Sequence, residues 1–406
     1  MNEPTFDALE GAVQSEGIPA LFDQLANILR AEKKYPQLFE ALLMKKRHEL
    51  GLPLQGGDTL RDLPEEKQIE VENYYVDVCR TVGGLFLDGG DIVASWPYFR
   101  AIDEPKLVAE AIEKWQPPTA TAGSGPESYE AAGSITDAIV DIALNQGANP
   151  RRGYELVLSQ YGVCRAITVF EHQMPFSGEV KEGCGVLLVS RLYHDLLESV
   201  KADVAAREGT SKEELAGETD LRKLIEGHPW LFSDHGYHVD VSHLQSVVRI
   251  ALGLRNREAL EKAVQMTEYG RRLARDFQSP DRPPFTDFYN DYRIYLQALV
   301  GTGVDGAIRY YTQKADRAAP DEEGRHFPGE VLVYLLYRVG RYRDAIDASL
   351  KYLKNTRVPL CMAPSLMELC EQAGEYSRLL ETAREHGDLL QFAAGLVKKT
   401  GVRSPD

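Results

Sequence analysis

The stretch 331–353 reads VLVYLLYRVGRYRDAIDASLKYL, and its apolar residues recur with the period of an α-helix. Four of them share one helix face at i, i+3, i+4 and i+7, namely Leu332, Leu335, Leu336 and Val339. Gly340 interrupts this stripe, and the same spacing resumes at Tyr342 and Ala345. Because a helix with one apolar stripe is stable mainly when that stripe is covered, the stretch predicts two short helices that pack against each other across a glycine-marked break.

The same arrangement, a glycine followed by an apolar or aromatic stripe, recurs in four other places. The expected breaks and the residues that follow them are Gly90 with Trp96, Gly162 with Ala166, Gly303 with Ala307, and Gly374 with Tyr376. In the carboxyl-terminal part the copies are regularly spaced, since 38 residues separate Val304 from Tyr342 and 34 separate Tyr342 from Tyr376. Upstream the intervals are longer and irregular. The spacing predicts helix pairs with a period close to that of a helix-turn-helix repeat.

These segments resemble tetratricopeptide repeats. Residues 340–346, which read GRYRDAI, are similar to the turn and second-helix start of such a repeat. The resemblance implies that the glycine permits close helix approach, that Tyr342 fills the interior of the pair and that Ala345 lies at the helix crossing. The segments 90–105 and 303–315 are similar to the same turn and helix.

The resemblance covers residues 70–115 and 300–400, although the tryptophan usual early in the first helix of a repeat is absent from these copies. It implies an all-α fold, a right-handed α-solenoid of stacked antiparallel helix pairs that is irregular in the middle. A compact helical bundle would also carry such stripes and is the alternative.

The chain is predicted to divide into four regions, according to whether the repeat pattern is present in each. We expect N-terminal helical repeats at 1–115, a linker or loop at 116–134, an irregular helical middle region at 135–280 and C-terminal repeats at 285–400. The linker is predicted because Pro, Gly, Ser and Thr gather there with almost nothing to bury. The short apolar run 185–189 is predicted to be helical rather than a strand, because the stripe continues beyond it at helical spacing.

The charge and composition of the chain argue against several classes of function. Its 46 Lys and Arg against 62 Asp and Glu give a formal net charge of -16, which repels a nucleic-acid backbone. The first residues show no basic start followed by an apolar core, and no later segment runs eighteen apolar residues, so we expect neither an export signal nor a membrane span. The five cysteines are scattered over apolar stretches, which predicts small buried side chains in a reducing compartment. We therefore expect a cytoplasmic protein that binds neither nucleic acid nor membrane.

Four of the nine histidines gather within sixteen residues, at His228, His235, His238 and His243. Imidazole and carboxylate groups together can bind zinc or iron, and Asp234 and Asp240 lie among them. The spacing fits no recognised metal pattern. The alternative is a helix boundary, in which Pro229 ends one helix after His228, and Asp240 or Ser242 caps the next.

A second chemical candidate is Cys164 with His172, eight residues apart on a loosely shared helix face. Nothing in the sequence supplies an oxyanion hole or an orienting partner, so Cys164 is expected to pack into the core. The paired glycines follow no predicted strand, which argues against a phosphate-binding loop.

These observations favour a binding protein. We expect a scaffold or adaptor that holds another protein or a peptide segment on the concave face of a helical-repeat array, without a cofactor. The alternative is a metal-dependent enzyme or sensor built on the histidine cluster from His228 to His243, so enzymatic activity is left open. A third alternative is self-association through the terminal helix Leu389–Val397.

Overall fold

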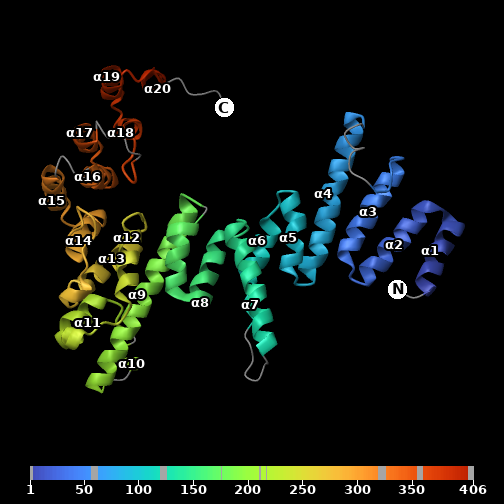
Figure 1. Cartoon of the computed structure of the whole chain (residues 1–406), viewed down its shortest axis with the longest axis horizontal. Helices are drawn as coiled ribbons and strands as arrows, with labels where there is room; N and C mark the ends of the chain where they lie inside the picture. The colour runs from blue at the N-terminus through green and yellow to red at the C-terminus, as the bar shows by residue number, and fades with distance from the viewer. Residues whose placement is uncertain are drawn as a thin grey trace. The chain divides into compact units, whose positions relative to one another are not determined.

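The computed structural model describes residues 3–55, 63–118, 126–174, 176–209, 212–215, 217–318, 326–353 and 360–400. The regular secondary structure in these ranges is helical, and none of the residues described belongs to a strand. The predicted all-α class is therefore confirmed. The chain divides into two compact units, residues 1–161 and residues 162–406, and each is described by itself (Figure 1).

The first unit is built of helices that follow one another along the chain (Figure 1). Their bounds are α1 Glu3–Glu16, α2 Ile18–Ala31, α3 Tyr35–Glu49, α4 Glu65–Asp88, α5 Ile92–Ala101, α6 Lys106–Lys114, α7 Pro126–Val140, the π-helical segment η2 Asp141–Asn145 and the first part of α8 Pro150–Thr168. Each helix from α1 to α5 packs against the next, and α5 contacts both α6 and α7.

Two apolar clusters hold the first unit together. One joins α2, α3 and α4 through the buried residues Ala26, Leu29, Leu38, Ala41, Val78 and Val82. The other joins α5 to α8 through Ile92, Trp96, Phe99, Val108, Ile112, Ile139, Ile142, Ala143, Ala148 and Leu156. Gly83 lets α4 lie directly on the ring of Phe99, because a Cβ at this position would come within 2.7 Å of that ring.

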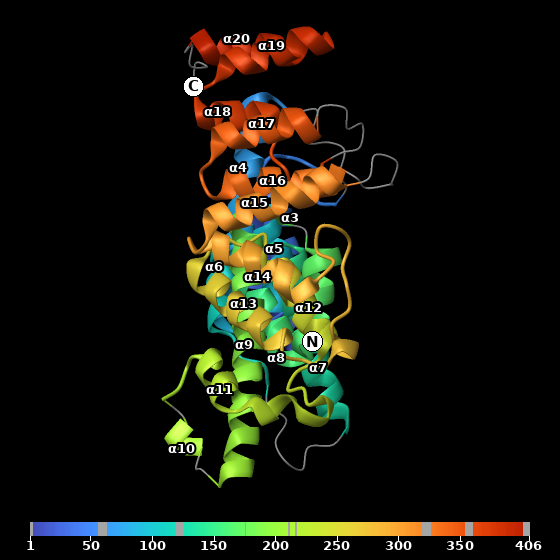
Figure 2. The same cartoon turned by 90° about the vertical axis from the view of Figure 1, so that its left-hand side faces the viewer.

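The second unit continues from the end of α8 through a longer series of helices. Their bounds are η3 Val169–Gln173, α9 Glu179–Glu208, α10 Lys212–Leu215, α11 Leu221–Gly227, η4 Pro229–His235, α12 Val241–Ala251, α13 Arg257–Gly270, η5 Arg275–Phe277, α14 Phe288–Leu299, α15 Val304–Arg317, α16 His326–Arg338, α17 Tyr342–Tyr352, α18 Leu366–Ala373, α19 Tyr376–His386 and α20 Leu389–Thr400. The long helix α9 contacts α12 and α13, and every helix from α12 to α20 contacts the next one (Figure 2).

A buried carboxylate joins α14 to α15 in the second unit. Asp291 is fully buried, and its carboxylate accepts hydrogen bonds from the hydroxyl of Tyr310 at 2.5 Å and from the backbone N–H of Asp287 at 2.8 Å. The ammonium of Lys314 lies 2.7 Å from the same group. A buried charge is tolerated when it is paired and hydrogen-bonded, so these contacts fix the two helices at this level.

The five glycines expected to break the helices all adopt positive φ, a region that favours glycine; they are Gly90, Gly162, Gly303, Gly340 and Gly374. Gly340 lies between α16 and α17, and Gly374 caps the end of α18. Gly162 instead lies inside α8, as a non-helical kink where the second unit begins. The small or aromatic residues that follow the breaks are buried or half-buried, namely Trp96, Ala166, Ala307, Tyr342, Ala345 and Tyr376.

The region 116–134 is more helical than predicted. α7 begins at Pro126, so residues 126–134 belong to a helix, while residues 119–125 lie outside the described ranges. Proline suits the first turn of a helix, and Ile139 anchors the far end of α7 in the core of the first unit. The division into four parts stays a prediction.

Two further expectations concern local structure. The run 185–189 lies inside α9, as its helical stripe predicts. Within the described ranges, no helix combines the length and the apolar character that crossing a membrane requires.

Candidate functional site

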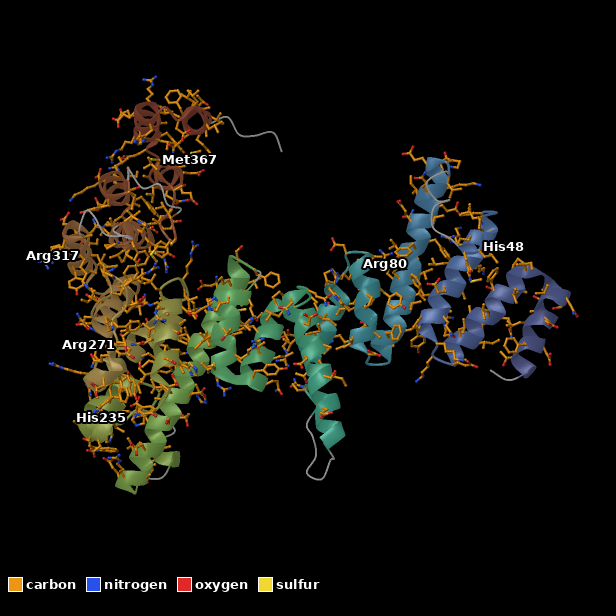
Figure 3. The ribbon with its side chains drawn as sticks, viewed as in Figure 1. His48, Arg80, His235, Arg271, Arg317 and Met367 are labelled. Atoms are coloured by element: carbon orange, nitrogen blue, oxygen red, sulfur yellow. The ribbon has the colours of Figure 1, made fainter. Side chains whose placement is uncertain are left out.

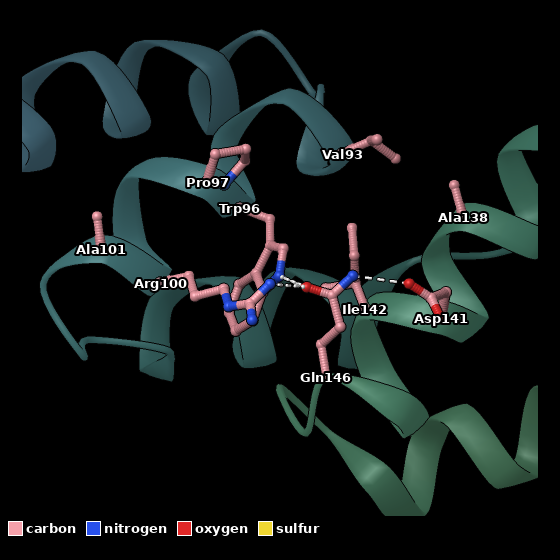
Figure 4. A pocket seen from close by; sticks show the side chains of 9 residues that line it. All are labelled: Val93, Trp96, Pro97, Arg100, Ala101, Ala138, Asp141, Ile142 and Gln146. Atoms are coloured by element: carbon pink, nitrogen blue, oxygen red, sulfur yellow. Dashed lines mark hydrogen bonds between the residues drawn. The ribbon is translucent and has the colours of Figure 1, made fainter.

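The first unit carries an open hollow between α5 and the helix formed by α7 and η2. Its volume is about 700 Å³, and its walls come from Val93, Pro97 and Ala101 on α5 and from Ala138 and Ile142 across from them (Figure 4). This volume lies in the range of known ligand-binding sites, roughly 300–1,000 Å³. These walls are apolar. The other lining residues carry hydrogen-bonding groups; they are Trp96, Arg100, Asp141 and Gln146.

α5 supplies the first polar side chains of the hollow. The helix begins after Asp91, whose carboxylate accepts a hydrogen bond from the backbone N–H of Ala94 at 2.9 Å and so caps the helix. One turn later Trp96 is buried, with 6% of its surface exposed, and one further turn places Arg100 on the same side. Both side chains reach toward Gln146, which follows η2 (Figure 4).

The carboxamide of Gln146 lies at the centre of a hydrogen-bond network. Its Oε1 accepts from the indole Nε1–H of Trp96 at 2.5 Å and from Nη1–H of Arg100 at 2.9 Å. Its Nε2–H donates to a carboxylate oxygen of Asp141 at 2.7 Å. Tryptophan and arginine can only donate and an ionised carboxylate can only accept, so the partners determine which end of the amide faces which helix.

The π-helical segment η2 brings Asp141 and Gln146 to the same side of the chain. The backbone N–H of Gln146 donates to the carbonyl of Asp141 at 2.9 Å, five residues back rather than four. The side chain of Asn145 donates to the other carboxylate oxygen at 2.8 Å. These hydrogen bonds from Asn145 and Gln146, with the nearby charge of Arg100, lower the pKa of Asp141 from its ordinary value. Such π-helical turns occur often at functional sites.

Close packing of α8 supports η2 from behind. Gly153 on α8 lies so near the π-helical segment that a Cβ there would come within 2.9 Å of the Cβ atoms of Ala143 and Leu144 and of the backbone nitrogen of Leu144. Because glycine alone fits this contact, α8 holds the backbone that carries Asp141 in place.

A second, smaller hollow adjoins the first. Its volume is about 430 Å³, and it shares Val93 and Ala138 with the larger one. Val93 is 37% exposed and Ile135, in the second hollow, is 47% exposed. Apolar surface therefore continues from one hollow into the next across the contact between α5 and α7.

Sequence reasoning identified only one residue of this network. The repeat pattern predicts Trp96 as a repeat position, whereas Arg100, Asp141 and Gln146 belong to no pattern in the sequence. Asp141 and Gln146 lie just after the apolar stripe of α7. Polar residues at such a position are typical of a helix end that faces solvent. Their partners on α5 lie more than forty residues away in the chain, so no local signal connects them.

The four clustered histidines have separate partners in the structure. His228 places Nδ1 2.7 Å from the carbonyl oxygen of Leu224, one turn back on α11. His235, labelled in Figure 3, has Nε2 3.6 Å from a carboxylate oxygen of Asp276. These two histidines therefore contact different partners, His228 a carbonyl one turn back on α11 and His235 a carboxylate more distant in the chain.

The other two histidines serve different contacts. The side chain of His238 is only 6% exposed, with Nδ1 2.9 Å from the hydroxyl of Tyr269 and Nε2 3.4 Å from a carboxylate oxygen of Asp203. His243 donates its backbone N–H to the Asp240 side chain that caps α12, as the helix-boundary interpretation predicts. Among the described residues, no three His, Cys, Asp or Glu side chains gather as metal ligands. The zinc or iron site stays a prediction, which metal analysis of gently purified protein tests.

The cysteine predictions need correction at two positions. Cys164 and Cys361 are exposed, whereas the other three cysteines are buried. After the kink at Gly162, Ala166 and Ile167 occupy the inward face of α8, which leaves Cys164 outside. Cys361 lies in a bend before α18 rather than inside a helix.

Comparison of the chain with protein-family models, with curated proteins and with solved structures found no match.

Proposed function

We propose that this chain is a helical-repeat protein that binds a segment of another protein, and that the hollow beside Trp96 is part of its binding surface. The observation that carries the proposal is an open, apolar-walled hollow whose polar side chains are already held in position by hydrogen bonds. A preorganised site loses less conformational freedom on binding, so more of its contact energy becomes affinity.

The order of the helix contacts supports a repeat architecture. From α1 to α5, and again from α12 to α20, each helix packs on its neighbour in the chain. Glycines with positive φ lie at several of the junctions, where tetratricopeptide-like pairs would have their turns. Under this proposal the helix pairs stack into a right-handed α-solenoid, and a partner lies along its concave face.

The openness of the hollow favours a peptide over a buried small molecule. Small-molecule sites enclose most of their ligand, whereas an extended or helical peptide lies in a groove and inserts single side chains. The adjoining second hollow would take a neighbouring side chain of the same peptide. The acidic net charge of -16 favours a neutral or basic partner segment, and a cytoplasmic location is part of the same proposal.

A peptide-display experiment tests this function. Random twelve-residue peptides are selected on the wild-type chain, and the binders are measured against A138W, which fills the hollow, and against A31W, which adds the same side chain at the exposed end of α2. We expect binders whose Kd rises at least roughly tenfold with A138W, a loss of about 1.4 kcal/mol, and stays unchanged with A31W. Circular dichroism verifies that both variants are folded.

Two results would contradict the proposal. One is a selection that yields no peptide binder to the wild-type chain. The other is a set of binders that A138W and A31W affect equally, since such peptides would bind elsewhere on the surface.

A further inference from the structure

We infer that the Trp96–Arg100–Asp141 group is a receptor for a carboxamide of the bound peptide, and that Gln146 occupies this receptor as an internal substitute when no peptide is bound. This inference rests on the proposed function and adds the chemical class of the ligand. It starts from an unusual position of Gln146, an exposed side chain whose amide is nevertheless bound from two sides by three groups.

The three surrounding groups match both ends of an amide. Trp96 and Arg100 present N–H donors toward one point, and Asp141 presents an acceptor on the opposite side (Figure 4). A carboxamide offers one carbonyl oxygen and one N–H in the same arrangement, so a ligand amide can replace the amide of Gln146 without moving the receptor. The carbonyl would then accept from Trp96 and Arg100, and the N–H would donate to Asp141.

The same groups discriminate against charged ligands. A carboxylate would meet Arg100 favourably but would place its second oxygen against the carboxylate of Asp141. An ammonium would meet Asp141 but would face the guanidinium of Arg100 and the indole N–H of Trp96. A neutral amide satisfies all three groups. Charged ligands should bind more weakly, because unpaired or like-charged contacts in a partly desolvated site cost affinity.

Apolar walls beside the receptor define the rest of the ligand. Val93 and Pro97 are exposed on α5, and Ala138 is half-buried across the hollow. An alkyl group attached to the amide would cover these side chains and remove their surface from water. The ligand is therefore an amide with an adjacent aliphatic group, supplied by an Asn or Gln side chain or by the peptide backbone itself.

Gln146 competes with such a ligand, because a tethered group has a high local concentration at its own site. Replacing Gln146 with alanine removes this competitor, while Trp96 stays packed in the apolar core and Asp141 keeps its hydrogen bond from Asn145. We expect the Kd of a small amide to fall roughly five- to tenfold in Q146A relative to the wild-type chain.

Nuclear magnetic resonance of the indole groups measures this directly. The chain has three tryptophans, Trp96, Trp115 and Trp230, so a ¹⁵N-labelled sample has three indole N–H signals, and W96F identifies the one of interest. The probes are isovaleramide, its N-methyl derivative and isovalerate, which share one alkyl group. We expect isovaleramide to shift the Trp96 signal saturably, more tightly in Q146A than in wild type, with isovalerate far weaker.

The probes also separate the two sources of the amide. Binding of isovaleramide alone assigns the receptor to Asn or Gln side chains, and equal binding of the N-methyl derivative assigns it to the peptide backbone. Either result supports the inference. If Q146A does not fold, Q146M removes the amide while keeping the length of the side chain and provides the same comparison.

Two outcomes would overturn the inference, namely no saturable shift of the Trp96 signal in the folded Gln146 variants, or equal binding of isovalerate. If one of these outcomes is found and selected peptides still lose affinity in A138W, the amide receptor is rejected while the proposed function stands. If the probes bind but no peptide does, the receptor stands and the proposed function fails.

Discussion

Replacing Gly153 with alanine tests whether the packing of α8 on η2 holds the site in place. The new Cβ would lie 2.9 Å from the Cβ atoms of Ala143 and Leu144 and from the backbone nitrogen of Leu144. Because these atoms belong to the backbone or are attached directly to it, the helices must separate. Overpacking of this kind costs about 1–3 kcal/mol, whereas alanine in place of glycine inside a helix gains up to about 1 kcal/mol. We expect G153A to lower the free energy of unfolding of the first unit by about 1 kcal/mol.

Gly133 provides the matched control. It lies in α7, and no atom would come within 4 Å of a Cβ added there. G133A should therefore raise the same free energy by about 0.5–1 kcal/mol, through helix propensity alone.

The assay is urea unfolding followed by tryptophan fluorescence in a W230F background, so that Trp96 and Trp115 report on the first unit. Since α8 supports Asp141 and Gln146, the indole N–H signal of Trp96 should also move in G153A and stay in place in G133A. A G153A variant as stable as G133A, with an unchanged Trp96 signal, would contradict a tight contact between α8 and η2.

Three further changes test other parts of the structure. Burial lowers the pKa of His238 in the folded chain below the ordinary value of about 6.5. As the pH falls, the unfolded chain therefore binds this proton at a higher pH than the folded chain does. The free energy of unfolding should fall as the pH drops below about 6.5, until the pKa of the folded state is reached. H238Q should flatten that part of a plot of the urea midpoint against pH, and an unchanged slope would assign the effect to another group. Glu330 is fully buried and accepts the backbone N–H groups of Cys361 and Met362 at 2.8 and 3.1 Å. E330A should cost about 1–3 kcal/mol in total, because two hydrogen bonds to a charged acceptor are lost, and should accelerate hydrogen exchange at both amides, whereas continued protection would show another acceptor. Removing the cap of α12 with D240A should cost about 1 kcal/mol in urea unfolding, and a midpoint equal to that of wild type would contradict its capping role.

The sequence alone determined the helical class and many local boundaries of this protein. Apolar residues at i, i+3 and i+4 predict a helix because the residues that make the stripe are neighbours in the chain. The breaks at Gly340 and Gly374 follow for the same reason, since a positive φ depends on the residue itself. The cap of α12 was also predictable, because Asp240 and the backbone N–H of His243 are three residues apart.

Tertiary structure decided everything that depends on groups far apart in the chain. It joined Trp96 to Gln146 across fifty residues and turned Asp141 toward the same amide through a π-helical turn. It also left Cys164 on the surface, which its apolar surroundings in the sequence did not predict. Periodicity shows which face of a helix is apolar, but only the packing of α5 against α7 determines which polar side chains meet at its edge and leaves a hollow between them.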